Sequence, residues 1–189
     1  MSSVVIDGGS LRIEDVFEVA SGKATVTLAP AARERARAAR RTIDTLVAQD
    51  VVAYGVTTGF GKLSEIAIPA HRLAELQVNL VRSHAAGVGP LLPDREVRAM
   101  MLLRANVIAK GYSGARPDLA ELLTGMLNAR LHPPIPEQGS VGASGDLAPL
   151  AHLALSLIGE GTLAHDGRVG PAGEMLSACG LSPVASKRL

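Results

Sequence analysis

Aromatic side chains are almost absent from this chain of 189 residues, which has two tyrosines, two phenylalanines and no tryptophan. Hydrophobic residues still make up 47% of the sequence, so the core must be built from aliphatic side chains. Such a composition excludes intrinsic disorder, which goes with few apolar and many charged residues. The shortage of rings also argues against modules that bind nucleic acids by stacking bases on aromatic side chains.

The net charge is close to zero, and the chain has one cysteine. Nineteen Lys and Arg residues balance eighteen Asp and Glu residues, which leaves a formal charge of +1. Without a strong field to attract nucleic acid or an acidic membrane surface, neither is expected as a partner. The single cysteine, Cys179, fits a reducing, cytoplasmic compartment. No signal peptide is expected, and the longest apolar run, residues 147–158, is too short to span a bilayer.

Hydrophobic periodicity and the positions of proline and glycine predict a mainly helical fold with a minor β element. Two short strands near the N-terminus are expected to pair, and a short hairpin is expected around Asp166-Gly167. No linker divides the chain, and the excess of apolar residues points to a subunit interface. The predicted strands cover residues 4–6 and 24–28, and the predicted helices cover residues 11–20, 30–49, 70–86, 93–109, 117–130 and 147–159.

Several polar clusters have ordinary structural interpretations. The helix predicted over 30–49 carries five arginines in its first half, and a solvated helix face is favoured over an anion patch because the net charge is near zero. Cys179 is expected to be a small packed residue. Four histidines lack metal-ligand spacing, so no metal is expected and structural or surface roles are assigned to them. They are His71, His132, His152 and His165.

Two glycine-rich loops are the most informative segments. The first, residues 54–61, fails the spacing of a phosphate-binding loop, because Val56 stands where that motif needs glycine. The second, residues 142–146, presents Ser144 at the predicted start of a helix. It does not match the Gly-x-Ser-x-Gly nucleophile elbow, because Gly145 directly follows Ser144. On residue types alone, a tight loop of small residues is favoured over a nucleophilic serine.

Three segments together resemble the histidine and aromatic amino-acid ammonia-lyases. They are residues 54–61 (YGVTTGFG), 77–89 (QVNLVRSHAAGVG) and 139–152 (GSVGASGDLAPLAH), in the order and spacing of that family. The resemblance implies that residues 1–189 are the N-terminal domain of the family's mainly helical, fumarase/aspartase-like fold. It also implies a carbon–nitrogen lyase acting on a small amino-acid substrate, and a homotetramer whose active sites each draw residues from three subunits.

The resemblance assigns an internally formed cofactor to Ala143, Ser144 and Gly145. In the family this tripeptide cyclises to a methylidene-imidazolone (MIO), so no external cofactor is expected. The Gly145 nitrogen attacks the carbonyl carbon of Ala143, one water is lost, and the Ser144 hydroxyl leaves as a second water. Small residues suit this step because the backbone must fold back sharply on itself. The product is an electrophile made from protein alone.

The resemblance also assigns roles to side chains outside that tripeptide. Tyr54 matches the base that removes the substrate β-proton, a role that needs a depressed pKa or a nearby positive dipole because phenols are weak bases near neutral pH. His84 matches the position that contacts the substrate side chain, with Ser83 beside it. This Ser-His pair favours L-histidine as substrate and trans-urocanate as product. A histidine can also hydrogen-bond a phenol, so tyrosine ammonia-lyase or tyrosine 2,3-aminomutase stays as the alternative.

The chain departs from the family in length. It ends before the Asn-Gly loop of the family, and it has no counterpart of the family's later glutamine, second tyrosine, carboxylate-binding arginine and glutamate. The central helical bundle and the C-terminal part are also absent from this sequence. The resemblance therefore implies that this piece alone is inactive or weakly active as an enzyme. A third interpretation is a catalytically silent fragment that acts in assembly.

Overall fold

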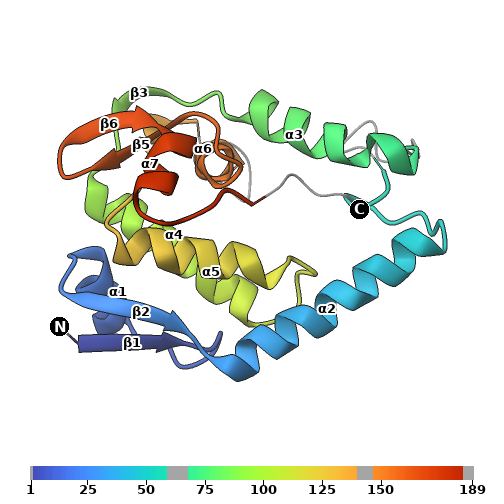
Figure 1. Cartoon of the computed structure of the whole chain (residues 1–189), viewed down its shortest axis with the longest axis horizontal. Helices are drawn as coiled ribbons and strands as arrows, with labels where there is room; N and C mark the ends of the chain where they lie inside the picture. Colours follow the sequence, from blue (N-terminus) through green and yellow to red (C-terminus); the bar gives the residue numbers. More distant parts are fainter. Residues whose placement is uncertain (1, 59–67, 140–146, 185–189) are drawn as a thin grey trace.

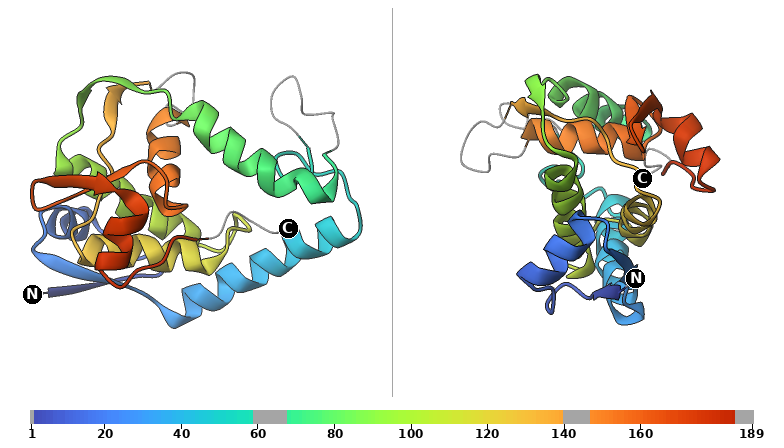
Figure 2. Two further views of the ribbon diagram at one scale, coloured as in Figure 1. Left: turned by 45° about the horizontal axis from the view of Figure 1, so that its top comes forward. Right: turned by 90° about the vertical axis from the view of Figure 1, so that its left-hand side faces the viewer.

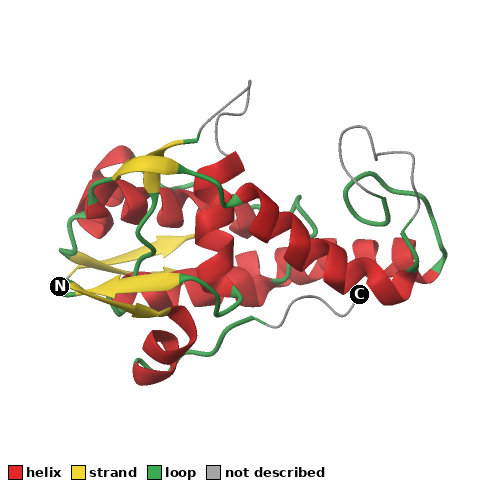
Figure 3. Cartoon of the chain, turned by 90° about the horizontal axis from the view of Figure 1, so that it is seen from above, coloured by secondary structure: helices red, strands yellow, loops and turns green. Residues whose placement is uncertain are grey.

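A computed structural model describes residues 2–58, 68–139 and 147–184 of the chain (Figure 1). This part is mainly helical and contains three separate two-stranded sheets, which confirms the predicted balance of helix and strand. The sheets gather toward the end of the molecule where the N-terminus lies (Figure 3). The elements are β1 (Ser2–Ile6), α1 (Ile13–Ala20), β2 (Ala24–Leu28), α2 (Pro30–Ala48), the 3-10 turn η2 (Ala70–Arg72), α3 (Leu73–His84), β3 (Val88–Leu91), α4 (Asp94–Ala109), α5 (Pro117–Asn128), β4 (Pro136–Gln138), α6 (Leu147–Leu157), β5 (Thr162–His165), β6 (Arg168–Pro171) and α7 (Ala172–Ala178).

The strands β1 and β2 form a parallel pair connected by α1. Their register aligns Val4 with Val26 and Ile6 with Leu28, which confirms the predicted pairing of these strands. Ile6 and Val26 are buried in the main core. On the other edge of β2, the side-chain amide of Asn128 accepts a hydrogen bond from the Val26 N–H (2.8 Å) and donates one to the Val26 carbonyl (2.9 Å). The sheet is thereby attached to the end of α5.

The helices α4 and α5 form the centre of the core. α4 also packs against α1, and the buried side chains of α4 recur every three or four residues, as expected for a helix with one apolar face. Among the described residues, every buried hydrophobic side chain is aliphatic, which confirms the expectation drawn from the scarcity of aromatics. The aromatic side chains at the surface are Phe17, Tyr54 and Tyr112.

A buried arginine joins α4 to the end of α1. The Arg98 guanidinium donates from Nε to the Ala20 carbonyl (3.0 Å) and from Nη2 to the Val19 carbonyl (2.9 Å). Carbonyls in the last turn of a helix lack intrahelical donors, so Arg98 caps α1 from a neighbouring element. Burial lowers the pKa of Arg98, and the nearby charge of Arg130 acts in the same direction.

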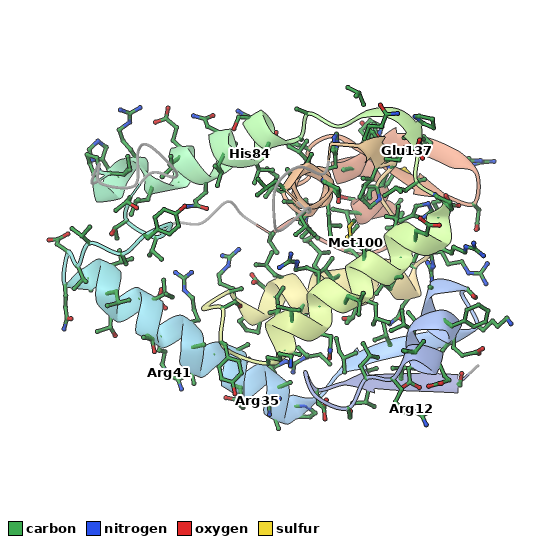
Figure 4. The ribbon with its side chains drawn as sticks, turned by 180° about the vertical axis from the view of Figure 1, so that it is seen from behind. Arg12, Arg35, Arg41, His84, Met100 and Glu137 are labelled. Atoms are coloured by element: carbon green, nitrogen blue, oxygen red, sulfur yellow. The ribbon has the colours of Figure 1, made fainter. Side chains whose placement is uncertain are left out.

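Two arginines of helix α2 contact neighbouring elements of the fold. Arg33 forms an ion pair with Glu121 of α5, with 2.6 Å between Nε and Oε1. Arg35 donates to the backbone carbonyl of Ala109, at the end of α4, while Arg41 lies farther along the outer side of α2 (Figure 4). The predicted solvated face is therefore only partly correct, because two of the five arginines hold α2 against its neighbours.

The C-terminal part of the described chain is a hairpin followed by a short helix. β5 and β6 are joined by Asp166 and Gly167, whose φ angles of 46° and 78° fit a two-residue type I′ turn. The hairpin predicted at this dipeptide is confirmed. The helix that follows it, α7, was not predicted, and its buried residues are Ala172 and Leu176.

The helices α3 and α6 form a second layer above α4 and α5. The helix predicted over 70–86 begins as the turn η2 and becomes α-helical over Leu73–His84. α6 passes beneath α3; it is seen nearly end-on in Figure 1 and lengthwise in Figure 2. Within the described ranges, none of the helices has the length and apolar character needed to cross a membrane.

Candidate active site

The loop that carries Tyr54 is held by hydrogen bonds of two threonines. The Thr57 hydroxyl accepts from the Ala53 N–H (2.9 Å) and donates to the Val51 carbonyl (2.9 Å). The buried Thr58 hydroxyl accepts from the Gly55 N–H at 3.2 Å, and Gly55 has a φ of 71°. Residues 51–58 are thus held by the side chains of this segment, while Tyr54 is 66% exposed.

The residues Ser83 and His84 end α3 and share one backbone acceptor. The Ser83 hydroxyl donates to the Leu80 carbonyl at 2.9 Å, and His84 Nδ1 lies 2.9 Å from the same oxygen. Because a carbonyl oxygen only accepts hydrogen bonds, Nδ1 carries the proton in this contact. A neutral His84 therefore presents Nε2 as an acceptor. The side chain is exposed, at the same edge of the molecule as Glu137 of β4 (Figure 4).

The antiparallel strands β3 and β4 connect two of the three motif segments. β3 follows the end of α3, and β4 leads into residues 139–146. Val88 is paired with Gln138, and Leu91 with Pro136. The pairing was not predicted, because the two strands lie far apart in sequence and are too short to show an alternating pattern. It brings the residues that follow His84 beside the residues that precede the Ala-Ser-Gly tripeptide.

The tripeptide Ala143-Ser144-Gly145 lies outside the described residues, but both flanks of its segment are described. A Cβ atom placed on Gly139 would lie 2.9 Å from the Ala148 Cβ and 3.0 Å from the Gly87 Cα. The two described ends that flank the segment 140–146, at Gly139 and at the start of α6, therefore lie close together beside the residues that follow α3. Ala148 is in the first turn of α6, so the segment ends at the N-terminal, positive end of that helix.

One cavity of about 330 Å³ is lined by residues of the first two motif segments and by the part of α6 that follows the third segment. It is bordered by the loop of Tyr54, by α3 and by α6, as well as by the turn before α5. On α3 the lining residues Gln77 and Val81 lie on the same face as His84, at spacings of four and three residues. The cavity thus brings the Tyr54 loop beside α3, and His84 lies about 5 Å beyond Val81 along that helix. The lining residues from the motif-bearing elements are Gly55, Val56, Gln77, Val78, Val81, Ala154, Leu157 and Ile158.

The histidines assigned to structural or surface roles have such positions. His132 is buried, and its Nε2 lies 3.1 Å from Oδ1 of Asp94. His152 Nε2 accepts a hydrogen bond from the Gly87 N–H at 3.1 Å, and burial lowers the pKa of His152. Cys179 packs against the core, as predicted. In the described ranges, no three His, Cys, Asp or Glu residues gather in a way that would hold a metal ion.

A sequence profile described as "Aromatic amino acid lyase" matches residues 11–188. The chain belongs to the aromatic amino acid lyase family. Membership covers nearly the whole chain and includes all three motif segments. It confirms the family indicated by the sequence motifs.

Two histidine ammonia-lyases and a tyrosine aminomutase are similar to the chain. Histidine ammonia-lyase of Stigmatella aurantiaca is 54% identical over 179 residues, which are 95% of this chain and 35% of that protein. Histidine ammonia-lyase of Trypanosoma cruzi has a matching structure, with 40% identity and a TM-score of 0.87 over 97% of this chain and 35% of that one. Tyrosine aminomutase of Streptomyces globisporus matches with 40% identity and a TM-score of 0.89, over 97% and 34% of the two chains. The chain therefore spans about a third of the length of these relatives.

Proposed function

We propose that the chain is the N-terminal, MIO-bearing portion of a histidine ammonia-lyase, which eliminates ammonia from L-histidine to give trans-urocanate. The observation that carries this proposal is the 54% identity with a histidine ammonia-lyase across 95% of the chain. In this proposal the active protein is a homotetramer of the fumarase/aspartase-like fold. Its central helical bundle lies outside these 189 residues.

His84 binds the substrate side chain in this proposal. Its Nδ1 is engaged by the Leu80 carbonyl, so Nε2 accepts a hydrogen bond from the imidazole N–H of L-histidine. Ser83 donates to the same carbonyl and lies 3.1 Å from His84 Nδ1, which restrains the rotation of the ring. The substrate then lies at the end of α3, beside the flanks of the segment 140–146.

Tyr54 is the base in this proposal and removes the β-proton of the substrate. Its loop is ordered by Thr57 and Thr58 and borders the same cavity as α3. An ordered loop lets a base approach the substrate with little entropic cost.

The electrophile is assigned to Ala143, Ser144 and Gly145. MIO supplies an electron-deficient carbon that makes ammonia a better leaving group. The described flanks suit a backbone that must fold back on itself, because Gly139 passes so close to Ala148 that a Cβ on Gly139 would lie 2.9 Å from the Ala148 Cβ. The N-terminus of α6 favours negative charge at the end of this segment.

The proposal is tested with two measurements on the complete protein, of which these 189 residues are the N-terminal portion; the 189-residue piece alone is expected to be inactive or weakly active. Incubation with L-histidine should give the absorbance of urocanate, and the intact mass should be two water molecules below the sequence mass. Ser144→Ala should prevent the mass deficit of two waters and abolish urocanate formation, because the methylidene group is made from the serine. Urocanate formation by the Ser144→Ala variant at the wild-type rate would contradict the role of this residue.

A second candidate is a tyrosine ammonia-lyase or tyrosine 2,3-aminomutase. The observation that favours it is the tyrosine aminomutase structure, which is as similar to this chain as the histidine ammonia-lyase structure. His84 Nε2 can accept a hydrogen bond from a phenol as well as from an imidazole. Formation of coumarate or β-tyrosine from L-tyrosine, with no product from L-histidine, would replace the first candidate by this one.

A third candidate is a catalytically silent chain that acts in assembly. It is supported by the coverage, since the chain spans 35% of the Stigmatella relative. An unmodified intact mass, together with no turnover of either amino acid, would favour this candidate over both enzymes.

A further inference from the structure

One long-range hydrogen bond connects two of the three motif segments. The Gly87 N–H donates to Nε2 of His152 over 3.1 Å, across 65 residues of sequence. Gly87 lies three residues after His84, and His152 lies in the second turn of α6. The bond therefore ties the end of α3 to the helix that follows the segment 140–146.

The backbone around this bond is packed too tightly for side chains. A Cβ on Gly87 would lie 3.1 Å from His152 Nε2 and 3.3 Å from the Pro136 Cβ. A Cβ on Gly139 would lie 3.0 Å from the Gly87 Cα. The two glycines thus let the chain after α3 and the chain before residue 140 touch directly, with His152 beside them.

The bond also defines the state of the imidazole. Nε2 accepts a hydrogen bond only when it carries no proton, so His152 is neutral and its proton is on Nδ1. Burial disfavours the charged ring and lowers the pKa of His152, which keeps it in this state at neutral pH. The acceptor is therefore present under the conditions in which the chain would work.

We propose that His152 is a positioning residue: by accepting the Gly87 N–H it holds the end of α3, and with it His84, against the strand and the helix that flank residues 140–146. This inference rests on the proposed function, which assigns substrate contact to His84 and the electrophile to the segment 140–146. His152 acts through the backbone of Gly87 and has no contact with the substrate in this proposal. Its effect is on where His84 lies.

Three variants of the complete protein test the proposal. His152→Leu removes the acceptor, whereas His152→Gln keeps a carbonyl oxygen that can reach the position of Nε2. His165→Gln is the control, because that histidine lies in the β5–β6 hairpin beside Asp166. A neutral hydrogen bond contributes about a factor of three to ten to an equilibrium, so His152→Leu should raise the KM for L-histidine by about that factor, with a smaller change in kcat. His152→Gln should recover most of the wild-type KM.

Amide hydrogen exchange is measured on the same variants, and it needs no turnover. In His152→Leu the Gly87 amide should exchange about tenfold faster, and it should stay protected in His152→Gln and in His165→Gln. Unchanged exchange at Gly87 in His152→Leu overturns the proposal, and so does faster exchange with an unchanged KM. If the complete wild-type protein does not act on L-histidine, the proposed function fails, and exchange along residues 84–87 alone decides whether His152 positions the end of α3.

Discussion

Helix α3 of the upper layer and helix α4 of the lower layer are stabilised in different ways. α4 buries seven of its residues, whereas α3 buries only Leu73. The α3 segment is held in part by polar links, such as the ion pair of Arg82 with Glu160 (2.7 Å) and the bond of Gly87 to His152. Residues that must meet a substrate need exposed positions, and a rigid apolar layer beneath them supplies the support. Variants at the exposed positions of the upper layer should therefore change activity, and variants in the lower layer should change stability.

Tyr54→Phe should give the largest effect, on activity alone. Loss of a general base lowers kcat by about 10² to 10⁴. The side chain is 66% exposed, so the free energy of unfolding should change by less than about 0.5 kcal/mol. Steady-state kinetics with L-histidine and urea unfolding measure the two effects. A kcat equal to that of the wild type would remove Tyr54 from the proposed mechanism.

Met101→Ala should give the largest effect on stability. Met101 is fully buried between α4 and its neighbours, and truncation of such a side chain costs about 2–5 kcal/mol. Val107→Ala on the same helix is the control, because Val107 is 45% exposed. Urea unfolding should show a clear loss for the first variant and a much smaller one for the second. Equal losses would mean that the lower layer is not the apolar support described above.

Arg98→Ala should destabilise the lower layer by a smaller amount. It leaves the carbonyls of Val19 and Ala20 without their donor, which costs about 1–3 kcal/mol. Arg98→Lys should fall between the wild type and Arg98→Ala, because an ammonium cannot reproduce the fork of a guanidinium. Arg95→Ala, at an exposed position of α4, is the control in urea unfolding. A wild-type midpoint for Arg98→Ala would show that the cap of α1 contributes nothing.

The smallest effect is expected from the titration of His152 in the upper layer. Its folded-state pKa is lowered by burial, so the unfolded chain binds a proton more readily. The contribution of His152 to stability is complete above about pH 6.5, the ordinary value of a histidine, and is lost as the pH falls below it. Unfolding at pH 7.5 and 5.5 should show a smaller loss for His152→Gln than for the wild type. An identical loss in both proteins would contradict a neutral His152.

Short sequence patterns predicted most of the helices and strands, but not the contacts between distant segments. Pro30 predicted the start of α2, and Asp166-Gly167 predicted a hairpin, because both depend on a few neighbouring residues. The parallel direction of β1 and β2 and the pairing of β3 with β4 depend on contacts between distant segments, which carry no local pattern. α7 was missed because seven residues show too little periodicity to indicate a helix.

In the candidate site, too, motifs indicated single residues but not the contacts between distant segments. Tyr54, Ser83 and His84 were indicated by the motifs in which they stand, and the structure describes all three. Their roles stay predictions, as does the role of the tripeptide 143–145. The acceptor role of His152 could not be found from the sequence, because its partner is the backbone of Gly87, and a glycine N–H leaves no signature in residue types.

The amide of Asn128 has a consequence for the behaviour of the protein in concentrated solution. A strand with an open edge offers its N–H and C=O groups to any extended chain nearby, which is a common beginning of aggregation. Asn128 occupies both groups of Val26, in the middle of β2, as a further strand would. A two-stranded sheet can therefore end there without recruiting a strand from another molecule. One side chain of α5 thus closes the edge of β2 at Val26.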